Sequence, residues 1–303
     1  MIKKHQVNKD FLNSRLDKWF KKNICDVPQS LLEKNIRIGK IKVNGKKTKS
    51  SYKLQYNDVI ILKNFNPVVK KKKYIQNKYN PTKNEIKSSS DFVIYDNDDF
   101  VVINKPSGIS VQSGTKSKKN IMDMLRSTKF FKDTVPYTVH RIDKDTSGIL
   151  IVAKNRQSAQ FFTSLFRVRK IYKTYLGIVL GKFNESKGKL EDELYYYEND
   201  KKVISKALTN FKVIDSNNKY SLLELNPYTG RKHQLRKQLL IHNHPIIGDV
   251  KYSLPNKLLK NKSKLMLHAY KISFSINNIK HEYIADLPAA FQKTLKEKNL
   301  KSF

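Results

Sequence analysis

An aspartate flanked by cations stands directly before an apolar run in this chain. Asp143 lies between Arg141 and Lys144, and the residues from Ile149 to Ala153 that follow have the composition of a buried strand. A carboxylate beside fixed cations stays ionised at neutral pH, so it can act as a base or as a nucleophile. Asp143 is therefore the first candidate for a catalytic residue.

Two later segments add an aromatic ring and a basic helix start. Tyr175 is the first residue of an apolar strand. Its ring either packs in the core or offers a face on which a nucleic-acid base can stack. The run Thr-Gly-Arg-Lys-His-Gln-Leu-Arg, from Thr229 to Arg236, ends one strand and opens a helix. Basic groups near a helix start can bind phosphates, although they can equally form a solvated helix face.

The segment from Asn104 to Gln112 contains two turn-forming residues directly after an apolar run. Pro106 and Gly108 force a turn there, one residue beyond Lys105. Such a turn can bring backbone amides close to a ligand. Taken alone, this pattern is typical of an ordinary connection after a strand.

Other catalytic chemistries have weaker support. A metal cluster could be drawn from three side chains, His242, His244 and Asp249. Two histidines separated by one residue at a helix end do not face one site, so we expect no metal. A hydrolase triad of Ser147, His140 and Asp143 would crowd one turn, and the chain lacks a Gly-x-Ser-x-Gly elbow. No P-loop or dinucleotide motif occurs in the sequence, and we expect no cofactor.

Charge indicates the class of partner. The 303 residues include 61 Lys and Arg against 26 Asp and Glu, a formal net charge of +35. These cations are spread along the whole chain, and such a field favours polyanions such as nucleic acid. An AT-rich genome would raise the lysine count by itself, yet it would not explain the shortage of acidic residues.

Cysteine content and hydropathy suggest the compartment. A single cysteine, Cys25, permits no intramolecular disulfide and no cysteine-based metal site. No apolar run approaches the roughly 20 residues that span a bilayer, and residues 1–9 contain no apolar signal core. We expect a cytoplasmic protein that does not contact membranes, with a monomer as the default state.

The elements that must position these residues fall into three segments. Residues 1–64 predict a small α+β domain, with helical spacing from Phe11 to Phe20, a second helix opening at Pro28, and a hairpin turn at Asn44-Gly45. Its strands are Ile41–Val43 and Val59–Leu62. Residues 65–90, which include the run Lys70–Lys73, are interpreted as a basic linker without periodicity.

Residues 91–303 predict a larger α+β domain, a mostly antiparallel sheet with helices on its faces. The expected strands are Phe92–Tyr95, Phe100–Ile103, Ile149–Ala153, Tyr175–Leu180, Ala207–Ile214, Ser221–Leu225, Leu265–Phe274 and Glu282–Ala285. The expected helices are Ile121–Arg126, Ser158–Phe166, Lys232–Leu240 and Ala289–Glu297.

Four separated motifs resemble, in order, those of the RluA family of pseudouridine synthases. They are Asn-Lys-Pro-x-Gly from Asn104, His-Arg-Ile-Asp-x-x-Thr-Ser-Gly from His140, Lys-x-Tyr ending at Tyr175, and Thr-Gly-Arg-x-His-Gln-Leu-Arg ending at Arg236. The resemblance covers nearly all of the chain. It implies isomerisation of uridine to pseudouridine in RNA by base flipping, without cofactor or metal.

The resemblance also implies roles for the matched residues. Asp143 is the catalytic residue, the ring of Tyr175 stacks on the target base, and Arg236 pairs with Asp143 through both arms of its guanidinium. Arg141 fills the gap left by the flipped base or holds neighbouring phosphates. The RNA-contacting set implied by the family is Arg141, His140, Lys105, Arg231, His233 and Leu267.

The N-terminal segment Val27–Lys47 resembles the S4 RNA-binding domain. Joined to the synthase motifs, it makes the chain most similar to the RluC type, which modifies large-subunit ribosomal RNA. The chain departs from the family pattern at Gly177, Gln238 and Asn243, positions of local packing. Two alternatives stay open: an RNA-binding protein without catalysis that assists ribosome assembly, and a nuclease that uses Asp143 with His140.

Overall fold

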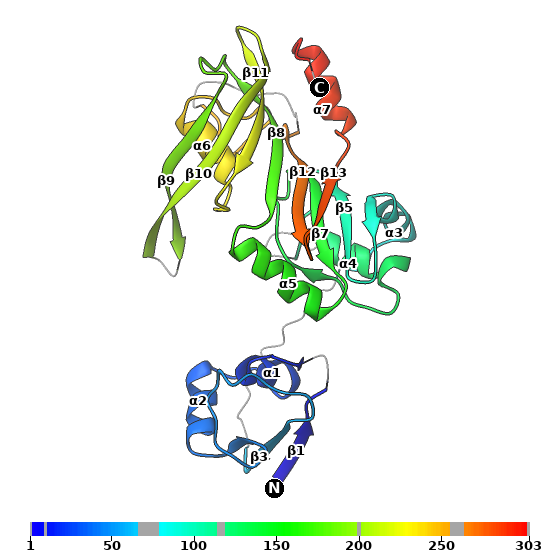
Figure 1. Ribbon diagram of the computed structural model, residues 1–303, viewed down its shortest axis with the longest axis vertical. Coiled ribbons are helices and arrows are strands. Elements are labelled where there is room, and N and C mark those ends of the chain that lie inside the picture. Colours follow the sequence, from blue (N-terminus) through cyan, green and yellow to red (C-terminus); the bar gives the residue numbers. More distant parts are fainter. Residues whose placement is uncertain are drawn as a thin grey trace. The chain divides into compact units, whose positions relative to one another are not determined.

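The computed structural model describes residues 2–8, 11–65, 79–113, 119–198, 201–254 and 264–301 (Figure 1). The chain divides into two compact units, residues 1–76 and residues 77–303. The Lys70–Lys73 run and the glycine-led segment 114–118 lie outside the described residues. None of the helices in the described ranges is long and apolar enough to cross a bilayer.

The N-terminal unit combines two helices with a three-stranded antiparallel sheet. The strand order is β1-β3-β2, and one buried cluster joins Trp19 and Phe20 to Leu32, Ile41 and Ile60. The elements are β1 Ile2–Gln6, α1 Leu16–Asn23, α2 Gln29–Arg37, β2 Ile41–Val43 and β3 Val59–Lys63.

In this unit the start of the first helix differs from the sequence prediction, and the predicted hairpin turn is present. The first helix begins at Leu16 rather than near Phe11, because Asn13 has φ +60°, which a helix cannot include. The Asn44-Gly45 turn is confirmed. Both residues have positive φ, and Val43 and Lys46 exchange backbone hydrogen bonds of 3.1 and 2.9 Å across it. Strand β1 was not predicted.

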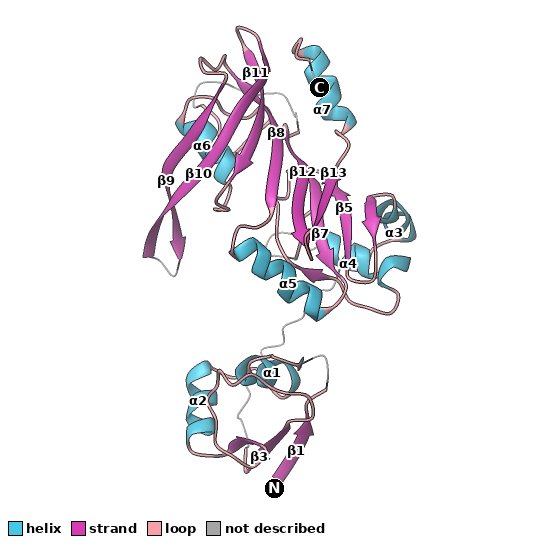
Figure 2. Ribbon diagram, in the orientation of Figure 1, coloured by secondary structure: helices cyan, strands magenta, loops and turns pink. Residues whose placement is uncertain are grey.

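The larger unit is built on a mixed, mostly antiparallel sheet with helices packed on it, as the sequence predicted (Figure 2). The order is β4-β5-β7-β12-β8-β11-β10-β9, with β13 beside β12, β6 beside β7, and a parallel step only between β7 and β12 among the described strands. The strands are β4 Val93–Asp96, β5 Phe100–Lys105, β6 Tyr137–Thr138, β7 Ser147–Ala153, β8 Tyr172–Leu180, β9 Lys187–Glu198, β10 Lys201–Ser216, β11 Tyr220–Pro227, β12 Leu267–Ile276 and β13 Ile279–Ile284. The helices are α3 Lys83–Ser90, α4 Ile121–Arg126, α5 Arg156–Arg167, α6 Gln234–Ile241 and α7 Ala289–Glu297, with one 3-10 turn at Lys129–Phe131.

Strands β5 and β7 are buried on both faces. Alternate residues point to opposite faces of a strand. Leu150 and Val152 pack in a cluster with Leu125 of α4, whereas Ile149 and Ile151 pack in a second cluster with Phe162 of α5. The apolar run that follows Asp143 is thus held from two sides.

Gly148 permits the parallel approach of β7 to β12. It has φ +109°, and a Cβ at this position would clash with the backbone of Ala269. Only glycine tolerates both the backbone conformation and the close contact. The placement of β12 beside β7 therefore depends on the glycine that closes the Asp143 motif.

Besides β1 and the two-residue strand β6, helix α3 and strand β9 were not predicted, because the apolar signal of these two elements is weak. Helix α3 lies in the segment interpreted as linker, but Thr82 and Glu85 form a capping box that starts it. Strand β9 is mostly charged or aromatic and buries Leu190 and Leu194 alone among its described apolar side chains. It pairs with β10 along its whole length.

Candidate active site

Asp143 lies on the loop between β6 and β7 and lines the cleft of the larger unit. Its side chain is 27% exposed, while the preceding Ile142 is buried in the α4 cluster and the following Thr146 is buried as well. The loop is therefore anchored on both sides of the carboxylate. The carboxylate itself remains open to a ligand.

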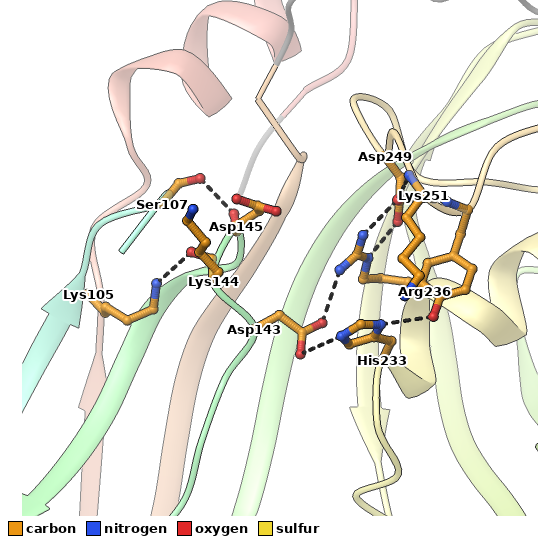
Figure 3. A network of polar contacts seen from close by, with 10 residues as sticks. Lys105, Ser107, Asp143, Lys144, Asp145, His233, Arg236, Asp249 and Lys251 are labelled. Carbon is orange, nitrogen blue, oxygen red and sulfur yellow. Dashed lines mark hydrogen bonds and ion pairs between the residues drawn. The ribbon is translucent and has the colours of Figure 1, made fainter. Parts of the chain in front are cut away.

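A second loop supports the Asp143 loop on the side away from Arg236 and His233 (Figure 3). The Lys105 ammonium donates to the carbonyls of Pro106, Ile109 and Lys144 at 2.8, 2.9 and 3.1 Å. Ser107 Oγ donates to the carbonyl of Asp145 at 2.7 Å. The Asn-Lys-Pro segment thus fixes the backbone next to Asp143.

The expected RNA contact of Lys105 is corrected by this arrangement. The side chain has no exposed surface, and its three hydrogens are used by three carbonyls. Burial lowers the pKa of Lys105 to about 7, partly offset by the charges of Asp145 and Asp143. Lys105 therefore shapes the active-site loop from the interior and does not face a ligand.

Arg236 reaches Asp143 from α6, but with one arm only. Its Nη1 lies 3.4 Å from Asp143 Oδ2, whereas Nε and Nη2 donate to the two carboxylate oxygens of Asp249 at 2.6 and 2.8 Å. The predicted bidentate pair with Asp143 is wrong, because the fork of the guanidinium is taken by the fully buried Asp249. Burial lowers the pKa of Arg236, but the hydrogen bonds and charge of Asp249 raise it overall, so the cation is permanent.

His233 supplies the other neighbour of the aspartate. Its Nε2 lies 3.7 Å from Asp143 Oδ1, and its Nδ1 lies 2.8 Å from the hydroxyl of Tyr252. Burial lowers the pKa of His233, so the ring is neutral at neutral pH although Asp143 opposes the shift. A phenol that donates to Nδ1 leaves Nε2–H facing Asp143.

Tyr175 and Leu267 line the same cleft from the central strands β8 and β12. Burial raises the pKa of Tyr175 far above its usual value, and the charge of Asp143 adds to the shift. The phenol therefore stays neutral. A neutral aromatic ring beside the carboxylate is suited to stacking on a base rather than to acting as a phenolate.

The two residues at the start of the Asp143 motif have different surroundings. Arg141 is exposed and lines the cleft. His140 Nε2 instead accepts the backbone N–H of Ile151 at 2.9 Å, and its ring stacks on Phe166. Burial lowers the pKa of His140 to about 3, so it is a neutral structural group.

The cleft is strongly cationic. It has a volume of about 1050 Å³, and among the described residues that line it Asp143 is the single carboxylate. Its cations are Arg141, Arg167, Arg169, Lys173, Arg231 and Arg236. A site of this charge attracts an anionic ligand and leaves one base or nucleophile at its centre.

The side chains proposed for a hydrolase triad and for a metal cluster do not come together. Ser147 Oγ bonds to His268 Nδ1 at 2.8 Å, away from His140, so the three triad candidates do not converge. The metal candidates also diverge, with His242 near Asp192, His244 on the carbonyl of Leu180 and Asp249 on Arg236. No cluster of metal-binding side chains occurs in the described part of the chain.

Comparisons with known proteins decide the family. A family model described as RNA pseudouridylate synthase matches residues 99–240. A Rickettsia conorii protein named ribosomal large subunit pseudouridine synthase C is 33% identical over 297 residues, covering 94% of this chain and 97% of its own length. A Vibrio vulnificus protein of the same name is 31% identical, covering 89% of this chain and 87% of its own. This chain belongs to the RNA pseudouridylate synthase family.

A solved structure agrees with this assignment. The human protein titled RNA pseudouridylate synthase domain containing 4 has a TM-score of 0.63 at 27% identity, over 72% of this chain and 96% of its own. In this pseudouridylate synthase the family match includes Asp143, Tyr175 and Arg236 but ends before Asp249 and Tyr252. The sequence alone did not indicate that Asp249 forms an ion pair with Arg236, because a loop separates the two residues along the chain.

One departure from the family pattern is accommodated by this synthase's own hydrogen bonds. The Gln238 amide donates to the carbonyls of Leu190 and Ala207 and to Asp192, while its oxygen accepts from Thr209 at 2.7 Å. The fully buried amide is therefore satisfied. The change leaves α6, and Arg236 on it, firmly attached to β9 and β10.

Proposed function

We propose that this enzyme converts uridine to pseudouridine in large-subunit ribosomal RNA. The observation that carries the proposal is a lone carboxylate, Asp143, held between Arg236 and a neutral tyrosine ring in a cationic cleft. The names of the similar Rickettsia and Vibrio proteins supply the substrate class. A cytoplasmic monomer is part of the same proposal.

The reaction breaks the bond between uracil N1 and ribose C1′, turns the base, and joins C5 to C1′. The hydrogen on C5 leaves and N1 gains a proton, so no electrons are exchanged with another reactant. Asp143 is the essential group, whether it attacks covalently or removes a sugar proton. Arg236 holds that carboxylate ionised and oriented in either route.

The target base must leave its stack to reach Asp143, at a cost of a few kcal/mol. Tyr175 and Leu267 provide a ring and an apolar wall to receive it. Arg141, exposed at the rim, replaces the base in the stack or binds the adjacent phosphates. The cations of the cleft bind the RNA backbone without reading its sequence.

The N-terminal unit, residues 1–64 in the sequence interpretation, is proposed to be an S4-like RNA-binding domain. Its two short helices and antiparallel sheet carry basic residues. It would add affinity for structured rRNA through phosphate contacts and shape.

Release of tritium from uracil C5 tests the proposed reaction. Large-subunit rRNA transcripts labelled at C5 should lose tritium to water when the wild-type protein is added. Asp143→Asn should reduce the rate at least about 1,000-fold while RNA binding stays within several-fold. Retained release in this variant would refute the role of Asp143.

The same assay separates the two alternatives. Shortened RNA on a denaturing gel would indicate a nuclease, because isomerisation leaves chain length unchanged. His140 is turned away from Asp143 toward the Ile151 amide, which argues against an acid–base pair for strand cleavage. Tight rRNA binding without tritium release would indicate an RNA-binding protein that assists assembly.

A further inference from the structure

We infer that Tyr172 and Tyr228 form a second stacking site, for an unpaired RNA base that neighbours the target uridine. The inference deepens the proposed function and rests on it for the substrate class. Both rings line the same cleft as Asp143. Their side chains are 70% and 55% exposed, although large aromatic rings are costly to leave in water.

The two tyrosines lie close to the end of one ladder. Strands β8 and β11 pair antiparallel, and Leu225 faces Tyr175 at the last pair of the ladder. Tyr172 and Tyr228 each lie three residues beyond that pair along their own chain segments. A hydrogen bond of 3.0 Å from Asn226 Nδ2 to Thr174 Oγ1 keeps the two chains together beyond the ladder.

Arg169 completes the site with a cation. Its guanidinium lies 4.6 Å from the centre of the Tyr228 ring. Lys173 lines the same cleft, and burial, with a smaller effect from the charge of Arg169, lowers the pKa of Lys173. A guanidinium beside a ring and an ammonium nearby suit a nucleotide, whose base stacks while its phosphate pairs with the cations.

The backbone conformation of Arg169 suggests that its side chain has a function. This residue follows α5 with φ +59°, at the position where a helix end normally has glycine. The N–H of Arg169 bonds to the carbonyl of Phe166, and that of Lys170 to Leu165, as in a Schellman motif. A left-handed arginine costs about 1–2 kcal/mol, so its presence here points to a use for its side chain.

Cleft size and spacing indicate a base beside the target rather than the target itself. Tyr172 precedes Tyr175 by three residues on β8, about 10 Å along the strand and on its opposite face, so the two rings do not hold the same base. The volume of about 1050 Å³ exceeds the need of one uracil ring, since pockets of roughly 300–1,000 Å³ hold whole drug-sized ligands. A single strand entering the cleft would therefore place one base near Asp143 and another on the two tyrosines.

Binding of a short single-stranded RNA tests the site in the full chain. The probe is fluorescein-labelled octauridylate, and every variant also carries Asp143→Asn so that no turnover occurs. Tyr172→Leu and Tyr228→Leu should each weaken binding about five- to 150-fold, the range expected when one base–aromatic stack is removed. Tyr172→Phe and Tyr228→Phe should bind within twofold of the parent.

A matched tyrosine outside the cleft provides the control. Tyr195 on β9 is 56% exposed and lies near Lys202 and Lys237, so it has a similar ring and similar cations. Tyr195→Leu should bind octauridylate as the parent does. An equal weakening in this variant would overturn the assignment to the cleft.

Two further measurements distinguish stacking from charge. With an octamer lacking bases, the leucine variants and the parent should bind equally, and a persistent difference would overturn stacking. Arg169→Ala should reduce the salt dependence of binding by the equivalent of about one phosphate, whereas Tyr228→Leu should leave it unchanged. Tritium release by the wild-type chain is measured separately, so a stacking site can stand or fall independently of the isomerisation.

Discussion

At the scale of the residue, the orientation of Asp143 depends on a chain of charged contacts that begins at a buried carboxylate. Asp249 is fully buried and holds Arg236 by two hydrogen bonds, and Arg236 contacts Asp143 with its remaining arm. Asp249 also accepts the backbone N–H groups of Lys251 and Tyr252 at 2.9 Å. One carboxylate therefore fixes the arginine on one side of Asp143 and the turn that holds His233 on the other.

Asp249→Asn should separate this positioning from RNA binding. Removing its charge weakens the fork that orients Arg236, so we expect kcat to fall at least about tenfold while KM for rRNA stays within a few-fold. Truncating one partner of a buried ion pair typically costs about 3–5 kcal/mol of stability, and the isosteric amide should cost less. Steady-state tritium release and urea unfolding measure the two effects.

Asp192→Asn is the matched control for that experiment. Asp192 also lies in the larger unit and binds Gln238 and His242, but it does not contact Arg236. If both variants lower stability alike and neither changes kcat beyond twofold, Asp249 is structural only.

Residue types in the sequence predicted the chemistry but not the connections. Asp143, Tyr175 and Arg236 converge in one cleft, as their motifs implied. The sequence analysis predicted that both arms of the Arg236 guanidinium bind Asp143, whereas two of its nitrogens bind Asp249. A motif shows which groups are present, but it does not show which carboxylate lies closer to the guanidinium. Lys105 was placed on the RNA for the same reason, whereas its ammonium is buried among carbonyls.

At the scale of the element, the Asn-Lys-Pro turn supports the loop that carries Asp143. Lys105→Met keeps the approximate length of the side chain but leaves three carbonyls without their donor, and each unsatisfied buried group costs about 1–3 kcal/mol. We expect a lower unfolding free energy and a kcat reduced at least about tenfold, with little change in KM for RNA. An increase in KM at unchanged stability would instead restore the RNA contact first expected of Lys105.

The β7–β12 junction should make stability depend on pH. His268 has no exposed surface, and Ser147 Oγ faces its Nδ1 while the carbonyl of Ala285 lies 3.2 Å from its Nε2. Burial lowers the pKa of His268 to about 4, although Ala285 and Asp286 oppose the shift. Because the unfolded value is about 6.5, the unfolded chain binds the extra proton first, and stability should fall as pH drops from about 6.5 toward 4.

His268→Gln tests that linkage. Urea unfolding of the wild-type chain, followed by circular dichroism, should lose more free energy between pH 7.5 and pH 5.0 than unfolding of the variant. The expected difference is about 1–2 kcal/mol for one proton over this interval. Identical pH dependence in the two proteins would place the acid sensitivity elsewhere, with His140 the next candidate.

Elements with strong apolar periodicity were predicted and polar ones were not. The buried run of β7 and the apolar run of β5 were readable because both faces of each strand are covered. The charged strand β9 gains its conformation from pairing with β10 rather than from its own composition. Helix α6 begins two residues later than predicted, because His233 has φ +54° and cannot be helical.

At the scale of the whole molecule, the chain has two units with separate hydrophobic cores. The N-terminal cluster runs from Val7 to Leu62, and the clusters of the larger unit begin beyond it. Each unit therefore has the apolar burial required to fold alone. Trp19, the single tryptophan, belongs to the first unit, so its fluorescence reports that unit alone.

Deletion of residues 1–76 should accordingly lower rRNA affinity without unfolding the remainder. Residues 77–303 should keep their thermal midpoint by circular dichroism, and tritium release from a short RNA should stay within a few-fold of the full chain. On large-subunit rRNA, kcat/KM should fall at least about tenfold. The slope of log affinity against log salt should become shallower by about 0.7–0.9 for each phosphate that the N-terminal unit neutralises in the full chain. An unchanged slope and rate on rRNA would mean that the cationic cleft alone binds the substrate, and that the charge of the N-terminal unit serves another purpose.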